Sequence, residues 1–376
     1  MNSEFNPNKV VGILGGGQLG RMLYQVSINL DVHLKFLDPD ANAPCSKYDF
    51  KQGDLNNAAD VFDFGKDCDI VTIEIEQVSV EGLRKLEAAG VKVFPSPDLI
   101  EMVQDKGVQK EFYLKNNIPT SDFELFESES KINWSIPFVQ KLRKGGYDGK
   151  GVSVINREDK LGSLLPGPSL VEELVSFEME VSVIVARNEN GDVKTFPMVA
   201  MDFDPEANLV EFLYSPSGYS KEIEDEGALI ATSIAEKADL IGVLAVEMFL
   251  TKTGEILVNE VAPRPHNSGH QTIEGNITSQ YEQHLRSILN LPLGNTDIIM
   301  PSVMLNLLGD KNSSGKAAYP GMAEVLGIKG VYPHIYGKAI SKPFRKMGHI
   351  TVLNESLENA KEIALRVKEI LKVIGK

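Results

Sequence analysis

The chain has 376 residues, of which 42% are hydrophobic and 24% charged, and its formal net charge is −15. A chain of this length is expected to form two or three domains, and its composition is that of an ordinary globular protein. The acidic balance argues against nucleic acid as a partner, because phosphate backbones are bound by clustered Lys and Arg.

Apolar runs and cysteines bear on the location of the protein. No apolar run reaches the roughly 18 residues that a membrane-spanning helix needs, and the first residues lack a charged-then-apolar export signal. Cys45 and Cys68 are the only cysteines, and they form no CxxC motif. We therefore expect no disulfide framework, no zinc site and no membrane partner, and we predict a reducing, cytoplasmic location.

The first hundred residues alternate between strand and helix patterns. A β-branched run at 9–15 ends in glycine, and apolar residues at helical spacing follow it at 16–31. Later segments continue the alternation, with strands at 32–38, 69–75 and 91–96 and a helix at 79–90. A β-loop-α-β unit of this kind predicts a parallel sheet, and we expect residues 1–101 to form one doubly wound α/β domain.

From residue 102 the pattern changes to that of an α+β domain. A predicted helix at 102–117 is followed by strand-like segments, then by a helix at 226–242 and a hairpin at 243–261; the strand-like segments are 136–143, 151–156, 169–175, 179–187 and 193–200. This order favours a mixed or largely antiparallel sheet over residues 102–295, with a flap subdomain at about 120–175. Apolar segments and a closing amphipathic helix at 357–374 predict a small C-terminal domain over 296–376.

The first motif with chemical meaning is a glycine-rich loop. Gly15, Gly17 and Gly20 form a G-x-G-x-x-G pattern after a strand and before a helix. Such a loop lets backbone amides approach a phosphate, and Asp38 at the end of the next strand fits the acid that binds a dinucleotide ribose. A tight turn that binds nothing is the structural alternative.

The second motif is the basic, glycine-rich segment 141–152, which lies between two predicted strands. Lys141 and Lys150 suit a flap that closes over a polyphosphate, with mobile amides and ammonium groups to neutralise its charge. An exposed basic turn is the alternative.

The third motif is a pair of carboxylates in the predicted hairpin. A two-residue turn at Thr253-Gly254 places Glu247 opposite Glu260, and a four-residue loop at 251–254 shifts the partner by two but keeps both on one face. Two carboxylates between apolar neighbours are costly unless a cation joins them, and Mg²⁺ prefers such oxygens, with Asn259 as a further ligand. A salt-bridged or solvent-facing pair is the alternative. Flap, lysine and carboxylates together predict a nucleoside triphosphate site.

Five sequence strings, in this order along nearly the whole chain, resemble those of a known family. They are "GGGQLGRM" at 15–22, "TIEIE" at 72–76, "GGYDGKG" at 145–151, "NEVAPRPHNSGH" at 259–270 and "RKMGH" at 345–349. The chain resembles the ATP-grasp enzymes and, more narrowly, the N5-carboxyaminoimidazole ribonucleotide synthetase family of purine biosynthesis. The resemblance implies the ATP-grasp architecture, an ATP-dependent carbon–nitrogen ligase, ATP and two Mg²⁺ ions as cofactors, and a homodimer.

Carried over residue by residue, the resemblance implies two adjoining sites. Glu247 and Glu260 would bind Mg²⁺. The ATP site would comprise Lys106, Lys141, Gly146, Tyr147, Asp148, Gly149, Lys150, Gly151, Val152, Glu172, Glu173, Leu174, Val175, Glu180, Asn259 and Glu260. The ribonucleotide would meet Gln18, Leu19, Glu74, Tyr147, Asp148, Arg264, His266, Asn267, Ser268, Lys338, Arg345 and Lys346. The first glycine loop would then cradle this substrate and not NAD. His270 receives no chemical role.

The implied reaction joins bicarbonate to the amine of 5-aminoimidazole ribonucleotide through carboxyphosphate, with release of ADP and phosphate. Asp148 would accept the proton of the amine, while Arg264 and Lys338 would hold the anionic intermediate. The chain departs from the family in two places: Lys150 stands where arginine is frequent, and Ala200 stands where a Glu or His near the nucleotide is common.

Other functions fit parts of the pattern. A formate-dependent glycinamide ribonucleotide transformylase, or another ATP-grasp carboxylase such as a biotin carboxylase, would share the flap and the acidic hairpin. An NAD(P)-dependent oxidoreductase would use the first loop but leaves the hairpin unexplained. A nucleotide-sensing scaffold would bind Mg-ATP without turnover.

Overall fold

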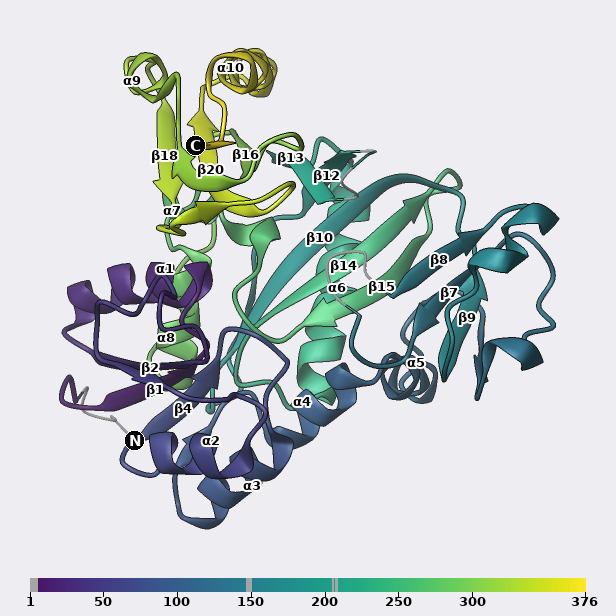
Figure 1. Cartoon of the computed structure of the whole chain (residues 1–376), viewed down its shortest axis with the longest axis horizontal. Helices are drawn as coiled ribbons and strands as arrows, with labels where there is room; N and C mark the ends of the chain where they lie inside the picture. Colours follow the sequence, from purple (N-terminus) through teal and green to yellow (C-terminus); the bar gives the residue numbers. More distant parts are fainter. Residues whose placement is uncertain (1–5, 147–150, 205, 207–208) are drawn as a thin grey trace.

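The computed structural model describes residues 6–146, 151–204, 206 and 209–376. An N-terminal parallel sheet lies at one corner of the molecule, a long antiparallel sheet runs through its middle, and a small four-stranded sheet projects at the far side (Figure 1). The C-terminal strands and helices lie above the N-terminal sheet in the same view. In the described part of the chain, no helix is long and apolar enough to cross a membrane.

The N-terminal sheet has the order β3-β2-β1-β4-β5, and all its neighbours are parallel, which confirms the predicted doubly wound domain. Its elements are β1 (Val10–Leu14), α1 (Gln18–Ser27), β2 (His33–Asp38), β3 (Phe50–Gln52), α2 (Ala58–Gly65), β4 (Ile70–Ile73), α3 (Val80–Ala88) and β5 (Lys92–Val93). The strand predicted at 69–75 ends at Ile73, so Glu74 and Glu76 follow the carboxyl end of β4. Sequence reasoning missed β3 and α2; β3 has three residues, and none of them is buried.

The segment predicted as one helix at 102–117 is two helices, α4 (Pro97–Gln104) and α5 (Lys106–Lys115). Asp105 between them is extended, and its carboxylate accepts hydrogen bonds from the backbone N–H groups of Gly107 and Val108. An aspartate in this N-cap position starts a new helix because it satisfies amides that have no partner within the helix. The break makes Lys106 the first residue of α5.

The projecting sheet corresponds to the predicted flap subdomain and has the order β6-β9-β7-β8, with antiparallel neighbours. Its strands are β6 (Phe123–Phe126), β7 (Phe138–Leu142), β8 (Val152–Ile155) and β9 (Ser169–Glu173). Val139, Lys141, Leu170 and Glu172 share one face, because Lys141 pairs with Leu170 and Val139 with Glu172. The opposite face packs Phe138 and Val171 into a small core of its own.

The central sheet has nine strands, and its main path runs β15-β14-β10-β12-β13-β16-β20-β18, with β11 paired to β10. Its first members are β10 (Phe177–Arg187), β11 (Val193–Thr195), β12 (Val199–Asp204), β13 (Leu209–Ser215), β14 (Gly242–Thr251) and β15 (Ile256–Ala262). The strand predicted at 193–200 is thus two strands. The largest core lies between this sheet and α6 (Lys221–Lys237), which begins five residues before the predicted 226 and ends five before 242. Its first turn has a single apolar residue, Ile223, among charged ones, which hid its start in the sequence.

The C-terminal strands continue the central sheet, because β13 pairs with β16. The remaining elements are α7 (Thr272–Gly275), α8 (Gln280–Ile288), β16 (Ser302–Leu308), β17 (Gly315–Ala318), α9 (Met322–Val325), β18 (Val331–Ile335), β19 (Ile340–Ser341), β20 (Lys346–Leu353), α10 (Leu357–Ile370) and β21 (Ile374–Gly375). α10 ends at Ile370, earlier than the predicted 374. Strands β19, β17 and β21 form a separate three-stranded sheet. The domain limits 1–101, 102–295 and 296–376 stay a prediction.

Candidate active site

The carboxylate pair lies where the sequence placed it, although the turn differs. Glu247 of β14 pairs directly with Glu260 of β15. Neither predicted turn occurs: Thr251 pairs with Glu255 through its backbone N–H, which leaves a three-residue loop. A bulge between Glu247 and Met248 then restores the opposition of the two glutamates. The extra residue is Asn259, and a bulge of this kind re-aims neighbouring side chains toward one side of a strand.

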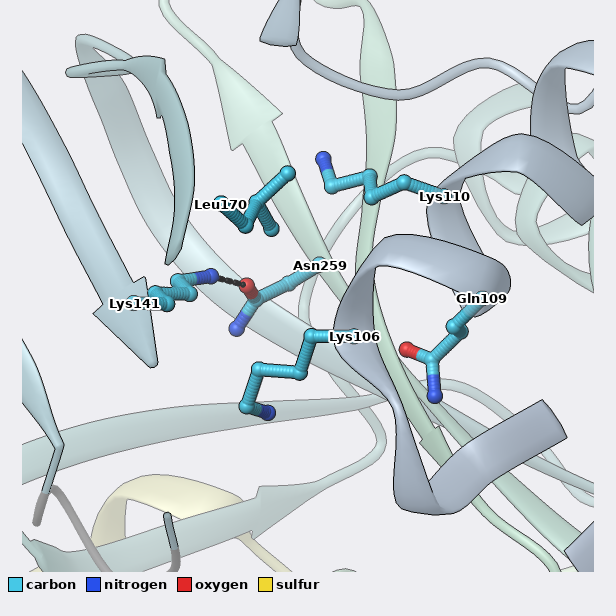
Figure 2. Close-up of a pocket in the computed structure, with 6 residues that line it drawn as sticks. All are labelled: Lys106, Gln109, Lys110, Lys141, Leu170 and Asn259. Carbon is cyan, nitrogen blue, oxygen red and sulfur yellow. Dashed lines mark hydrogen bonds between the residues drawn. The ribbon is translucent and has the colours of Figure 1, made fainter. Parts of the chain in front are cut away.

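Lysines from two other elements meet this hairpin. Lys106, at the start of α5, forms an ion pair with Glu260. Lys141, on β7, donates to Oδ1 of Asn259 at 2.8 Å and forms an ion pair with Glu172. A narrow pocket lies between these groups, as Figure 2 shows; it is lined by Lys106, Gln109, Lys110, Lys141, Leu170 and Asn259. Sequence reasoning missed Lys110 and Gln109, although Lys110 follows Lys106 at the i, i+4 spacing of one helix face.

The two glutamates of the hairpin have pKa values that are shifted in opposite directions. Lys106, and after it Lys141, lower the pKa of Glu260 against the opposing effect of desolvation. Burial raises the pKa of Glu247, and the nearby carboxylates of Glu260 and Glu180 raise it further, while Lys346 and Lys106 act in the opposite direction. The pair thus holds one carboxylate that favours its charged form and one that resists it. A divalent cation would remove this conflict.

The base of the flap is tied to the helix that carries Lys106. Arg143 forms two 2.9 Å hydrogen bonds to the carboxylate of Asp105, and its carbonyl accepts the backbone N–H of Lys106 at 2.9 Å. Gly151, with φ of +78°, returns the chain to β8, and its carbonyl accepts the N–H of Leu142. Of the predicted flap residues, Gly146, Gly151 and Val152 are described, whereas Tyr147, Asp148, Gly149 and Lys150 lie outside the described residues.

The resemblance implies that a linker of four residues reads adenine through its backbone, namely Glu172, Glu173, Leu174 and Val175. This linker begins inside a strand. β9 extends through Glu173, whose N–H donates to the carbonyl of Asp122, so only Leu174 and Val175 of the four residues lie beyond the sheet. The side chain of Glu172 is buried and faces the pocket lysines. Glu180 lies on β10, and burial raises its pKa to about 7. Ala200 pairs with Val181 of β10, which puts it on the face of the sheet opposite to Glu180 and away from the pocket.

The first glycine loop is already satisfied by carboxylates of the protein itself. Glu74 accepts the N–H of Gly17 at 2.6 Å and that of Leu19 at 3.3 Å, and Asp38 accepts the N–H of Gly16 at 2.8 Å. Burial raises the pKa of Glu74 to about 7 in spite of these bonds. The amides that the motif predicts as an anion cradle are therefore bound to Glu74 and Asp38. Leu19 is buried, and Gln18 is the first residue of α1.

The "PRPHNS" turn, residues 263–268, contacts both the acidic hairpin and the segment that follows β4. Arg264 forms a 2.8 Å ion pair with Glu76, which sequence reasoning did not assign although it belongs to the quoted "TIEIE" string. His266 Nε2 lies 3.2 Å from Glu247, and its Nδ1 lies 3.0 Å from the hydroxyl of Ser268, which contacts Ser182. Both polar atoms of the Asn267 amide are buried without a hydrogen bond to the part of the chain that the structure describes.

His270 and the C-terminal residues named from the sequence make contacts within the protein. His270 is buried against the hydroxyl of Tyr281 at 2.9 Å, a structural contact. The ammonium group of Lys338 donates to the carbonyl of Lys346 at 2.7 Å. Its neighbour Gly337 lies close to α1, since a Cβ there would be 3.1 Å from a guanidinium nitrogen of Arg21. Arg345 donates to the carbonyl of Ile340.

Family models match three parts of the chain. The ATP-grasp domain matches residues 111–281, the ribonucleotide synthetase preATP-grasp domain matches 8–104, and the phosphoribosylaminoimidazole carboxylase C-terminal domain matches 302–363. The N5-carboxyaminoimidazole ribonucleotide synthase of Bacillus subtilis is 35% identical over 360 residues, which cover 93% of this chain and 92% of that protein. This chain belongs to the N5-carboxyaminoimidazole ribonucleotide synthase family.

Solved structures agree with this assignment. The N5-carboxyaminoimidazole ribonucleotide synthetase of Thermotoga maritima has a TM-score of 0.90 and 42% identity, covering 98% of this chain and all of that one. The Aspergillus clavatus synthase, solved with ADP and 5-aminoimidazole ribonucleotide, has a TM-score of 0.88 and 32% identity, covering 97% and 98%. Against the phosphoribosylaminoimidazole carboxylase of Saccharomyces cerevisiae, 35% identical, the chain spans 65% of that protein's length. The predicted ATP-grasp fold is therefore confirmed, and ATP is the nucleotide of this fold.

Proposed function

We propose that this protein is an ATP-dependent ligase that carboxylates the exocyclic amine of 5-aminoimidazole ribonucleotide, with bicarbonate as the carbon source and ADP and phosphate as the other products. The observation that carries the proposal is the direct opposition of Glu247 and Glu260, with Lys106 and Lys141 facing them across one pocket. Family membership supports the choice of substrate.

Three steps account for the products. An oxygen of bicarbonate attacks the γ-phosphorus of ATP, and the bond to ADP breaks to give carboxyphosphate. Carboxyphosphate breaks its C–O bond to give CO₂ and phosphate within the site. The lone pair of the exocyclic amine then attacks CO₂, and the amine proton passes to a base, for which Asp148 remains our candidate. Lys106 and Lys141 neutralise phosphate charge during transfer.

The residues at the hairpin fit Mg²⁺. Glu247 and Glu260 offer opposed carboxylate oxygens, and Asn259 offers an amide oxygen beside them. Burial, and after it the carboxylates of Glu260 and Glu180, raise the pKa of Glu247, and a bound cation would offset both effects. These residues would hold the metal, which when bound neutralises the polyphosphate. Lys106, now paired with Glu260, is placed to remain beside the phosphates.

The second substrate fits the space between the glycine loop and the "PRPHNS" turn. Arg264 and His266 adjoin Glu76 and Glu247, and the unbonded Asn267 amide can both donate to and accept from an imidazole ribonucleotide. Lys338, between β18 and β19, and Lys346, at the start of β20, would supply positive charge for its phosphate. Glu74 would reach the ribose. Homodimerisation and a cytoplasmic location stay predictions.

Phosphate release tests this proposal. We expect rapid release with ATP, bicarbonate and 5-aminoimidazole ribonucleotide together, and only slow background release when the ribonucleotide is omitted. Glycinamide ribonucleotide with formate provides the comparison arm. Release that responds to that pair and not to the imidazole substrate would overturn the proposal in favour of a transformylase.

A further inference from the structure

Lys110 is a buried lysine in the wall of the nucleotide pocket, and none of its N–H groups is available to a nucleotide. It is 2% exposed and lies one helical turn after Lys106 on α5. Its ammonium group donates to the hydroxyl of Thr120 at 2.6 Å, to the hydroxyl of Ser121 at 2.8 Å, and to Oε2 of Glu172 at 2.8 Å. A lysine ammonium has three donors, and these three contacts use all of them.

Glu172 is the centre of the group that Lys110 joins. The residue is 3% exposed, and it contacts Lys110 and Ser121 through Oε2 and Lys141 through Oε1. Burial alone would raise the pKa of Glu172, but Lys141 and Lys110 outweigh burial and lower it to about 2. Glu172 is therefore a charged anchor for Lys141, and it keeps that charge because two ammonium groups flank it.

The same contacts join three elements that bear on the nucleotide. Thr120, which accepts from Lys110, donates to the carbonyl of Val258 at 2.7 Å, immediately before Asn259 and Glu260 in β15. Glu172 is the last residue but one of β9 and the first residue of the predicted adenine linker. Lys141 reaches from β7 to Asn259 (Figure 2). One buried lysine on α5 thus links the flap sheet to the acidic hairpin and fixes their relative positions.

We propose that Lys110 is a positioning residue for the nucleotide site, which acts through Glu172 to fix Lys141 and the linker without itself contacting the nucleotide. Lys106 pairs with the carboxylate of Glu260 and Lys141 donates to the amide oxygen of Asn259, contacts that a polyphosphate can replace, whereas Lys110 is committed to groups of the protein. The inference rests on the proposed function for the identity of the nucleotide.

Binding of Mg-ADP, measured by isothermal titration calorimetry, tests this role. Lys110→Met leaves Glu172 with one counter-ion and frees Lys141 to shift, so we expect the Kd to rise about 10- to 100-fold. Lys115→Met, at the exposed end of the same helix, is the matched control and should bind like the wild type. A Lys110→Met protein with the wild-type Kd would overturn the proposal.

A double-mutant cycle separates positioning from direct contact. If Lys110 acts only through Glu172, then Lys110→Met/Glu172→Gln binds Mg-ADP no more weakly than Glu172→Gln alone. Losses that multiply would show a direct contact and overturn the proposal. Should Lys110→Met not fold, Ser121→Ala removes a shared partner of Lys110 and Glu172, and we expect a rise in Kd of about threefold; no rise would again overturn it.

Steady-state kinetics adds a readout that a general loss of stability would not give. Lys110→Met should raise the KM for ATP and leave the KM for the ribonucleotide unchanged. Equal rises in both would contradict positioning of the nucleotide. If the wild type shows no ribonucleotide-dependent turnover, the proposed function fails, but the calorimetric comparison still decides the role of Lys110.

Discussion

The glycine loop at 15–20 and the pocket beside β15 both bring polar groups together, but their charges are balanced differently. In the loop, backbone amides are bound by Glu74 and Asp38, so donors and acceptors are matched within the protein. In the pocket, Glu247 faces Glu260, and Lys106 and Lys141 make contacts that a ligand can replace. The comparison teaches that clustered polar groups can be satisfied within the protein in one place and left open to a ligand in another.

The largest expected effect is a loss of ATP turnover when the pocket beside β15 is changed. Glu260→Gln removes the carboxylate that pairs with Lys106 and opposes Glu247, so ATP turnover should fall by about 100-fold or more. Phosphate release at saturating ATP measures it. The control is Glu255→Gln, exposed in the turn of the same hairpin, which should retain wild-type turnover. Wild-type activity in Glu260→Gln would contradict the metal and phosphate assignment.

A substitution in the glycine loop should lower the stability of the protein and raise the KM for the ribonucleotide. At Gly17 a Cβ would lie 2.3 Å from a carboxylate oxygen of Glu74, so Gly17→Ala must displace that carboxylate. We expect a loss of about 2 kcal/mol in the free energy of unfolding, measured with urea, and a higher KM for the ribonucleotide but not for ATP.

A matched control for this change is Gly162→Ala. No atom lies within 4 Å of a Cβ at Gly162, and its φ is ordinary. Its stability should stay within about 0.5 kcal/mol of the wild type. Equal losses in the two variants would show that the Glu74 contact has no special role.

The smallest effect concerns the pH dependence of stability. Burial and the carboxylates of Glu260 and Glu180 raise the pKa of Glu247. As the pH rises, the unfolded chain therefore loses this proton at a lower pH than the folded protein does. The contribution of Glu247 to the free energy of unfolding should therefore be largest below its ordinary pKa of about 4.3 and should decline as the pH rises. Glu247→Gln should flatten this decline by about 1 kcal/mol or more, as seen by urea unfolding from pH 5 to 9.

Mg²⁺ should also affect the pH dependence that Glu247 causes. Mg²⁺ favours the charged carboxylate, so adding it should reduce the decline in the wild type and leave Glu247→Gln unchanged. Glu255→Gln should titrate like the wild type. A decline of equal slope in all three proteins would remove Glu247 as its source.

Local patterns predicted much of the fold and the acidic pair. Alternating strand and helix signals gave the parallel sheet, and the opposition of Glu247 and Glu260 could be predicted because side chains alternate along strands. The turn length could not be predicted, and the bulge at Asn259 compensated for it.

The remaining features depend on partners distant in sequence. Lys110 meets Glu172, and Arg264 meets Glu76, only after separate elements pack together. The occupation of the loop amides by Glu74 has the same origin: nothing local to "GGGQLG" shows that a carboxylate 57 residues later will bind Gly17. Motif spacing reports which groups are available, whereas tertiary packing decides which of them are left for a ligand.

The most direct test follows the carbon of bicarbonate. With ATP, ¹³C-bicarbonate and 5-aminoimidazole ribonucleotide, carbon-13 NMR should show a new carbamate signal that grows in step with phosphate release and is absent in the Glu260→Gln protein. Phosphate release without label on the ribonucleotide, or label transfer that does not require ATP, would contradict the proposed function.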